Sequence, residues 1–204
     1  MIPRRLIRSV PEATDPQVEA WWAEACDLHP DWEHVTYRDP IDSTLFTTTS
    51  PYWSRCTSGA QLAGLVRLEA LWRWGGFYID SDVEVFRPFD PLLGATVVAG
   101  WEDPNVVPDA VLGAEAGHQL IGLCLTLALE RLKSESADWR TGAGAWSTGP
   151  GVTTTILPGT EALLLPPGSF YPYHYGEKER RDADHRTEQP WAFCAHHWNS
   201  SWTQ

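Results

Sequence analysis

The sequence predicts an α/β domain with a mostly parallel central sheet flanked by helices. Short strand patterns alternate with longer helical patterns in the first half of the chain, as they do in βαβ units. Two aspartates, Asp80 and Asp82, stand at the carboxyl end of one strand, where open α/β sheets bind their ligands. The chain has 204 residues, 43% of them hydrophobic, enough for a sizeable core. We therefore expect a single domain over residues 1–204.

Hydrophobic periodicity and turn residues place the elements of the first half. Apolar residues recur every three to four positions in the two predicted helices, and Thr14 or Asp15 can cap the first of them. A stretch rich in Thr, Ser and Pro has no period, which indicates a loop. The predicted strands are 2–10 and 34–38, the predicted helices 15–28 and 58–74, and the loop 39–57.

The predicted helix 58–74 carries one arginine that does not fit its apolar face. Glu69 and Arg73 form an i,i+4 pair, whereas Arg67 points to the other side among small residues. A guanidinium in such surroundings needs an anionic partner. Arg67 either forms a structural ion pair with Asp80 or Glu84, or it has a functional role in which it orients Asp80 or contacts a ligand directly.

Two glycines, Gly75 and Gly76, let the chain reverse from this helix into a short strand of bulky residues. Residues at i and i+2 of a regular strand point the same way, so Asp80 and Asp82 are expected on one side. Two like charges repel, and a cation or a polyhydroxyl ligand would satisfy both. Residues 83–86 are expected to continue the strand.

The second half shows weaker but similar patterns. Glu102 and Asp103 follow a buried strand pattern, and they either bind acceptor hydroxyls or form a solvated turn. His118 lies at the start of a helical pattern and is more typical of a cap or a surface residue than of a ligand. The predicted strands are 97–101, 162–165 and 191–195, the predicted helix is 118–132, and a Gly-rich loop is expected at 134–147.

Charge and composition restrict the partners. A net charge of −12 argues against a direct nucleic-acid-binding patch or an anionic membrane surface, because both would be repelled. No segment approaches the roughly 20 apolar residues of a spanning helix, and no signal peptide is recognisable at the start. We expect a soluble, cytoplasmic monomer or weak oligomer. The four cysteines are expected to be free thiols.

Three interpretations of Asp80-Ser81-Asp82 compete. The motif can be a solvated strand end with turn-forming acids. It can carry the aspartate nucleophile, Asp80, of a phosphatase-like hydrolase, although the only lysines available to that chemistry are Lys133 and Lys178. It can also hold a divalent cation for a nucleotide-sugar diphosphate. Oxygen ligands with one imidazole favour a hard cation, Mn²⁺ or Mg²⁺.

The residues around Asp80-Ser81-Asp82 favour the third interpretation, a cation site for a nucleotide sugar. Arg67-x3-Leu71-x3-Gly75-Gly76-x-Tyr78-x-Asp80-x-Asp82, followed much later by His196-His197-Trp198-x-x-Ser201-Trp202, resembles the glycosyltransferase family with the DXD sugar-binding motif. That family includes Golgi α-mannosyltransferases, capsular polysaccharide enzymes and toxin glucosyltransferase domains. The similarity is closest over about residues 58–93 and at the end of the chain. It implies a GT-A-like fold with a nucleotide-binding sheet.

One position departs from the family. Members commonly carry Ser-Asp or Ala-Asp three residues before the arginine, and here the pair is Ala63-Gly64. The missing carboxylate normally helps to bind the donor. The departure bears on donor identity and affinity, and it keeps a non-catalytic nucleotide-sugar-binding relative open as an alternative.

The resemblance also implies roles for individual residues. Asp80 would contact the donor's ribose and sugar hydroxyls, and Asp82 would bind the metal with His196, His197 being the second choice. Asp109 stands where the family usually has Asn, near the sugar, and joins Arg67 and Asp80 as a catalytic candidate. The residues implied in donor binding are Arg67, Tyr78, Asp80, Gly149, Ser201 and Trp202.

The activity implied is metal-dependent transfer of a hexose from a nucleotide diphosphate sugar to an acceptor hydroxyl. The acceptor class is open: glycan, lipid, protein or modified DNA. The family retains anomeric configuration, and no carboxylate stands out as a nucleophile. We therefore expect front-face transfer, in which the leaving phosphate oxygen takes the acceptor proton.

Overall fold

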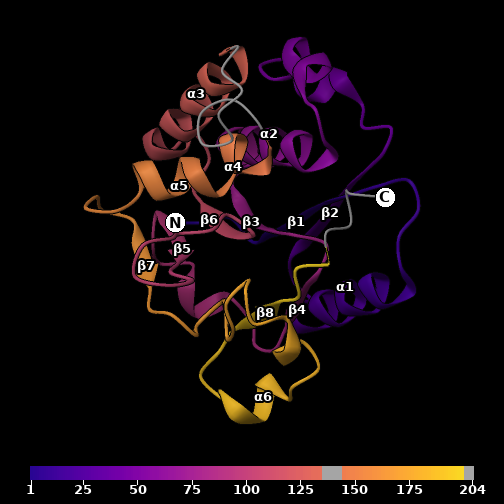
Figure 1. The fold of residues 1–204 in the computed structure, drawn as a ribbon, viewed down its shortest axis with the longest axis vertical. Coiled ribbons are helices and arrows are strands. Elements are labelled where there is room, and N and C mark those ends of the chain that lie inside the picture. The colour runs from indigo at the N-terminus through magenta and orange to yellow at the C-terminus, as the bar shows by residue number, and fades with distance from the viewer. Residues whose placement is uncertain (135–143, 200–204) are drawn as a thin grey trace.

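The apolar strand patterns assemble into one six-stranded sheet in a computed structural model, described over residues 1–134 and 144–199 (Figure 1). The sheet order is β2-β1-β3-β6-β5-β7. Pairings β1·β2, β1·β3 and β5·β7 are parallel, and β6 runs antiparallel to both of its neighbours. The mostly parallel sheet is thus confirmed. Its strands are β1 (Arg5–Val10), β2 (Glu33–Arg38), β3 (Gly76–Ile79), β5 (Val97–Gly100), β6 (Val111–Ala114) and β7 (Leu163–Leu165).

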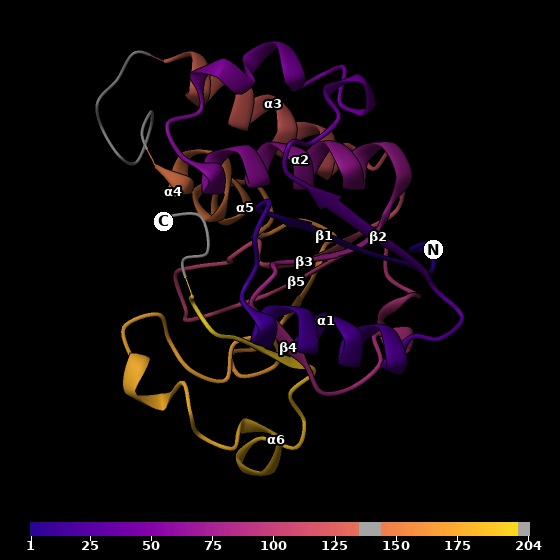
Figure 2. The same ribbon diagram turned by 90° about the vertical axis from the view of Figure 1, so that its right-hand side faces the viewer.

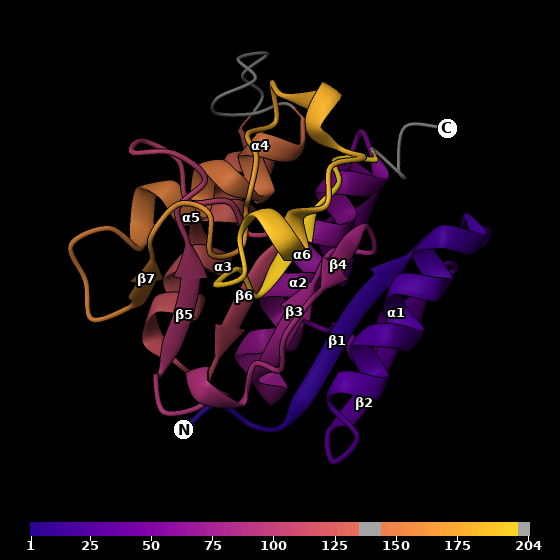
Figure 3. The same ribbon diagram turned by 90° about the horizontal axis from the view of Figure 1, so that it is seen from below.

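Helices and a small second sheet cover the two faces of the central sheet (Figure 2). One face carries α2 (Gly59–Trp74), α3 (Gln119–Lys133), α4 (Ala145–Thr148) and α5 (Pro150–Ile156). The other carries α1 (Pro16–Leu28) and an antiparallel pair, β4 (Val83–Val85) with β8 (Cys194–His196), with α6 (His185–Glu188) beyond it (Figure 3). None of the helices in the described ranges has the length and apolar composition needed to cross a bilayer.

Strand alternation divides the core between the two faces. In β1, Leu6 belongs to the cluster on the α1 side and Ile7 to the cluster on the α2 side. In β3, Phe77 and Tyr78 divide in the same way, as expected of successive strand residues. Both faces of the sheet are therefore buried, which leaves its strand ends and edges as the places for a ligand.

Local signals set most helix starts. Asp15 accepts a hydrogen bond from Gln17 N at 2.7 Å, Ser58 from Gln61 N at 3.3 Å, and the His118 ring from Leu120 N at 3.2 Å. Each is an N-cap that satisfies a helix-terminal N–H group. The expected caps Asp15 and His118 are confirmed.

Several boundaries differ from expectation, and of the predicted strand 191–195 only Cys194 and Ala195 belong to β8. Residues 83–86 do not continue β3; the chain turns at Asp80–Asp82, and β4 pairs with β8 in the separate sheet. The predicted loop 39–57 contains two short 3₁₀ helices, at Ser43–Leu45 and Ser50–Arg55. Of the predicted loop 134–147, residues 135–143 lie outside the described ranges and Ala145 begins α4.

The helix-to-strand turn needs both of its glycines. Gly75 and Gly76 have φ of +65° and +115°, and a side-chain carbon at either position would lie within 2.8 Å of backbone atoms. Only glycine adopts such conformations at little cost. The close turn lets β3 enter the sheet directly from α2, which places the strand end beside the helix face that carries Arg67.

Gly64 lets α2 pack closely on Thr148 at the end of α4. A Cβ at Gly64 would lie 2.7 Å from Thr148 O and 2.9 Å from its hydroxyl, and that hydroxyl donates to Gln61 O at 3.1 Å. The departure from the family pattern at residue 64 therefore has a packing reason: Thr148 occupies the space that a side chain would need.

Gly64→Ala is expected to lower the free energy of unfolding by about 1–3 kcal/mol, because the added methyl group overpacks this contact. Urea denaturation provides the measurement. Gly94→Ala is the matched control, since nothing lies within 4 Å of its Cβ position, and it should change stability by less than about 0.5 kcal/mol. Equal effects of the two substitutions would contradict the packing account.

Candidate functional site

A cavity of about 190 Å³ lies at the carboxyl end of β3. Its walls come from six parts of the chain: α2, the turn after β3, the segment before β6, the starts of α4 and α5, the loop that contains Tyr175, and β8 with the tail that follows it. Most of the polar residues in its walls are those that the sequence singled out. They are Arg67, Asp80, Asp82, Asp109 and His196, with Gly149, Tyr175 and Trp198 beside them.

Arg67 is the central charge of this cavity. It is 4% exposed, and its guanidinium bonds to both Asp109 and Asp80. The Tyr78 ring lies beneath it, 4.6 Å from the guanidinium carbon to the ring centroid. Burial alone would lower the pKa of Arg67, but the two carboxylates outweigh it and raise this pKa. Of the two partners expected, Asp80 is present, while Glu84 lies elsewhere and Asp109 takes its place.

Asp109 is the most enclosed carboxylate of the site. It is 3% exposed, and burial, together with the neighbouring Asp80, raises the pKa of Asp109 against the opposing effect of Arg67. Gly149 packs directly on it, because a Cβ there would lie 3.2 Å from both carboxylate oxygens. The structure therefore brings Asp109 and Gly149 together, as two of the residues implied at the donor.

Tyr78 is also at the site, but its hydroxyl points away from the cavity. The hydroxyl bonds to the Ser9 side chain and accepts from Ser9 N–H at 3.2 Å. The ring is fully buried and supports Arg67 from below. Tyr78 therefore supports Arg67 from beneath the cavity and does not line the cavity itself, where the resemblance implied a contact with the donor.

Asp80 and Asp82 lie in a turn and not on a regular strand. Asp80 N–H donates to Ala110 O at 2.7 Å, the last bond of the β3–β6 ladder, and Val83 N–H donates back to Asp80 O at 3.1 Å. The i,i+2 argument for a shared side therefore does not apply. The turn nevertheless brings both carboxylates to one place, because each has an oxygen within 4.8 Å of the His196 ring nitrogen and of the other.

The tail after β8 wraps around Asp82. His196 Nε2 lies 3.1 Å from Asp82 Oδ1, Asn199 N–H donates to Oδ2 at 2.6 Å, and His197 N–H donates to the main-chain oxygen of Asp82 at 3.0 Å. Burial would raise the pKa of Asp82, yet the imidazole and the Asn199 amide hold it at about 2. Burial would lower the pKa of His196, and Asp82 raises it instead.

Asp80, Asp82 and His196 fit a divalent cation. The His196 Nε2 atom is 3.1 Å from an Asp82 oxygen and 4.0 Å from an Asp80 oxygen. Ligands bonded at about 2.1 Å to an octahedral Mg²⁺ are separated by about 3 Å when adjacent and about 4 Å when opposite. Two carboxylates with one imidazole suit Mg²⁺ or Mn²⁺. Within the described residues this is the one such group of acidic, His or Cys side chains.

His197 is not part of that group, which corrects its expected role as an alternative ligand. Its Nε2 lies 3.1 Å from Glu84 Oε2 and its Nδ1 3.3 Å from the Tyr173 hydroxyl. The ring stacks on Trp21, with centroids 4.3 Å apart. His197 follows the last residue of β8, and its ring lines a different cavity from that of His196.

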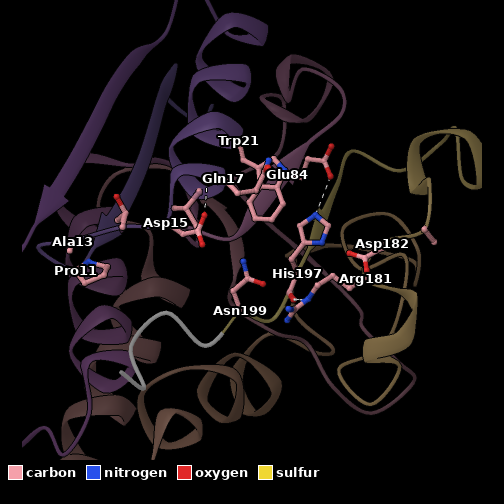
Figure 4. Close-up of a pocket in the computed structure, with 13 residues that line it drawn as sticks. Pro11, Ala13, Asp15, Gln17, Trp21, Glu84, Arg181, Asp182, His197 and Asn199 are labelled. Atoms are coloured by element: carbon pink, nitrogen blue, oxygen red, sulfur yellow. Dashed lines mark hydrogen bonds and ion pairs between the residues drawn. The ribbon is translucent and has the colours of Figure 1, made fainter.

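Alternate residues of the tail face two different cavities. His196 and Trp198 line the smaller one, while His197 and Asn199 line a larger cavity of about 880 Å³ against the start of α1. Figure 4 shows this second cavity, with the His197 ring directed toward Glu84 and with Arg181 beneath the tail. Arg181 donates to the main-chain oxygens of His197 and Trp198 at 3.0 and 3.2 Å. The tail is therefore held from both sides.

Trp198 has a backbone conformation that the sequence spacing of a regular strand does not predict. Its φ of +53° is the one positive value among the described non-glycine residues, and its ring packs on His196 with centroids 4.0 Å apart. In the sequence, Trp198 is marked only by its position in the His196-His197-Trp198 motif. Ser201 and Trp202, implied at the donor, lie outside the described ranges.

Three buried donors in the cavity walls lack a protein acceptor in the described part of the chain: Arg67 Nε, His196 Nδ1 and Trp198 Nε1. A buried polar group without a partner costs about 1–3 kcal/mol. All three can donate N–H groups. These three N–H groups are shielded from solvent, so they are unsatisfied donors behind the cavity wall.

Comparison with known proteins agrees with this geometry. Residues 16–99, which include Arg67 and the Asp80-Ser81-Asp82 turn, match the family described as "Glycosyltransferase sugar-binding region containing DXD motif". The chain is 30% identical to inositol phosphoceramide mannosyltransferase 3 of Schizosaccharomyces pombe over 99 residues, 47% of this chain and 28% of that protein. It is 28% identical to inositol phosphoceramide mannosyltransferase 2 of the same organism over 149 residues, 71% of this chain and 43% of that protein.

Two solved structures share the fold. The PaToxG glycosyltransferase superposes with a TM-score of 0.60 and 14% identity, covering 93% of this chain and 75% of that one. A glycosyltransferase involved in the glycosylation of the major capsid of PBCV-1 superposes with a TM-score of 0.52 and 12% identity, covering 98% of this chain and 96% of that one. The predicted resemblance to DXD glycosyltransferases and the GT-A-like fold are therefore confirmed. The chain spans less than half the length of the two yeast relatives.

Arg67→Met is expected to lower the free energy of unfolding by about 3–5 kcal/mol, because it leaves Asp109 buried without a countercharge. In Arg67→Met/Asp109→Asn, removal of that carboxylate should recover about 1–3 kcal/mol. Urea denaturation of both variants, with exposed Arg55→Met as the control, measures the difference. A double variant at least as unstable as Arg67→Met would contradict the assigned pairing.

Proposed function

We propose that this chain, whose residues 16–99 match the sugar-binding region of the DXD glycosyltransferases, transfers a hexose from a nucleotide diphosphate sugar to an acceptor hydroxyl. The observation that carries the proposal is the convergence of the Asp80–Asp82 turn with the tail, which together present three ligand atoms within 4.8 Å of one another. The names of the yeast relatives, both mannosyltransferases, support mannose as the first hexose to test.

Asp82 and His196 would hold a Mn²⁺ or Mg²⁺ ion, with Asp80 beside them. When bound, such an ion supplies positive charge for the diphosphate that leaves during transfer. The Asn199 amide fixes one oxygen of Asp82 and leaves the other directed at His196. The protein's part is therefore to keep two carboxylates and an imidazole in place before the donor arrives, which reduces the cost of organising the site.

The sugar is assigned to the Arg67 side of the cavity. The cavity there has a volume of about 190 Å³, and it would take the sugar ring while the nucleotide extends beyond it. Arg67, Asp80 and Asp109 present charged groups whose positions are fixed by mutual bonding. Such pre-positioned groups discriminate between the hydroxyl arrangements of different hexoses, because a mismatched hydroxyl leaves a buried partner unpaired.

Transfer with retention is the second part of the proposal. A double displacement needs a carboxylate free to attack the anomeric carbon. The acidic residues lining the cavity are Asp80, Asp82 and Asp109, and each is engaged by Arg67 or by the tail. In the front-face route, the bond from the anomeric carbon to the phosphate oxygen breaks, the acceptor oxygen bonds to that carbon on the same face, and its proton passes to the leaving phosphate oxygen.

Screening a panel of nucleotide sugars for Mn²⁺-dependent release of nucleoside diphosphate tests the activity. We expect release with at least one donor, loss on chelation with EDTA, and a fall of at least about 100-fold in Asp82→Asn, because a metal ligand is removed. Asp31→Asn, an exposed aspartate in the turn before β2, is the matched control. Donor binding without release would favour a non-catalytic relative, and release of phosphate from phosphomonoesters would favour the hydrolase.

The stereochemical outcome is tested on the product of the active donor. NMR of the anomeric proton should show the donor's own configuration, an α linkage from an α-linked nucleotide sugar, because attack and departure occur on one face. A β linkage from that donor would overturn the front-face route and leave the transferase assignment in place.

A further inference from the structure

The smaller cavity has a closed inner end and an open rim. Arg67, Asp82, Asp109 and His196 are all buried, whereas Tyr175, which lines the same cavity, is 51% exposed. If the donor sugar binds at the inner end, the acceptor must approach from the rim. Tyr175 is the one exposed aromatic side chain among the described residues that line this cavity.

Tyr175 is linked to the candidate metal group through one other ring. It meets Trp198 edge to face, with centroids 5.5 Å apart and planes at 80°. Trp198 in turn packs on His196 at 4.0 Å between centroids. The two aromatic rings form a corner that extends from the ligand atoms to the solvent. A ring-shaped molecule lying in this corner would therefore be next to the group that is being transferred.

Polar contacts hold the backbone of Tyr175 in place. Its N–H donates to Glu102 Oε1 at 2.7 Å. His174 Nε2 lies 3.6 Å from Glu102 Oε1 and 3.5 Å from Asp103 Oδ2, and the His174 ring accepts from Gly176 N–H at 2.9 Å. The rim is thus braced by the turn that follows β5, and the aromatic platform is pre-positioned.

The chemistry around Tyr175 selects among acceptors. An aromatic face packs against the C–H surface of a sugar or cyclitol ring, and His174, the neighbour of Tyr175 in sequence, has a side chain that is 47% exposed and can bond to hydroxyl groups. Two carboxylates near the rim repel an anionic group. An alkyl chain would gain from the ring but would leave these polar groups without partners.

We propose that Tyr175 forms the acceptor subsite and that the acceptor is a neutral polyhydroxylated ring, a sugar or a cyclitol. The inference rests on the proposed transferase function and specifies its second substrate. Of the two acids that the sequence left open, Asp103 accepts from the Asn105 and Val106 N–H groups as part of a turn, and Glu102 supports the backbone of Tyr175.

The test compares transfer with hydrolysis, in which water replaces the acceptor. With the donor that the nucleotide-sugar panel identifies, methyl α-D-mannopyranoside and myo-inositol serve as ring acceptors and hexan-1-ol as the apolar one. Wild-type protein should glycosylate a ring acceptor in preference to hexan-1-ol. Tyr175→Ala should lower the ratio of transfer to hydrolysis at least tenfold, and Tyr175→Phe, which keeps the ring, should stay within about threefold of wild type.

Trp191→Ala is the control, because Trp191 is 57% exposed and does not line the cavity; its ratio should equal that of wild type. Saturation-transfer NMR with the ring acceptors adds a readout that needs no turnover, and its signal should disappear in Tyr175→Ala. An unchanged ratio, or a preference for hexan-1-ol, would overturn the acceptor subsite while diphosphate release still supports the transferase. Absence of release with every donor would overturn both.

Discussion

The ion-pair cluster of Arg67 with Asp109 and Asp80 is the interaction on which the arrangement of the site depends. It joins α2, the end of β3 and the segment before β6 at one buried point. A buried ion pair adds little net stability, but removal of one partner is costly, because the other charge is left unpaired. The cluster therefore defines where Asp80 stands, and so where the acidic turn lies relative to the cavity.

The tail is the second constraint, and it depends on strand alternation. Pairing of β8 with β4 brings His196 opposite Val83, directly after the acidic turn. From there His196 faces Asp82 while His197 anchors the other side through Glu84 and Trp21. Adjacent histidines thus serve different purposes, one at the candidate metal group and one in the support of the tail. The supporting contacts also explain how a chain end can contribute to a pre-formed site.

Patterns with local causes were predictable from the sequence, and side-chain directions at irregular positions were not. The parallel strands, the caps at Asp15 and His118 and the convergence of Arg67 with Asp80 follow from periodicity, end signals and unsatisfied charge. The i,i+2 argument failed because Asp80–Asp82 form a turn. The ligand role of His197 failed because the register of β8 cannot be deduced from one strand alone. Tyr78 lies beneath the cavity and not in its wall, because its hydroxyl bonds to Ser9, a partner far away in sequence.

In the proposed site, Asp82 and His196, which are 114 residues apart in sequence, share one ion. Pulsed electron paramagnetic resonance of the Mn²⁺-loaded protein tests it most directly, because the hyperfine coupling of a bound imidazole nitrogen reports the ligand itself. We predict coupling to one histidine nitrogen, lost in His196→Ala and retained in His197→Ala. A signal without nitrogen coupling, or one that survives in His196→Ala, would contradict the claim.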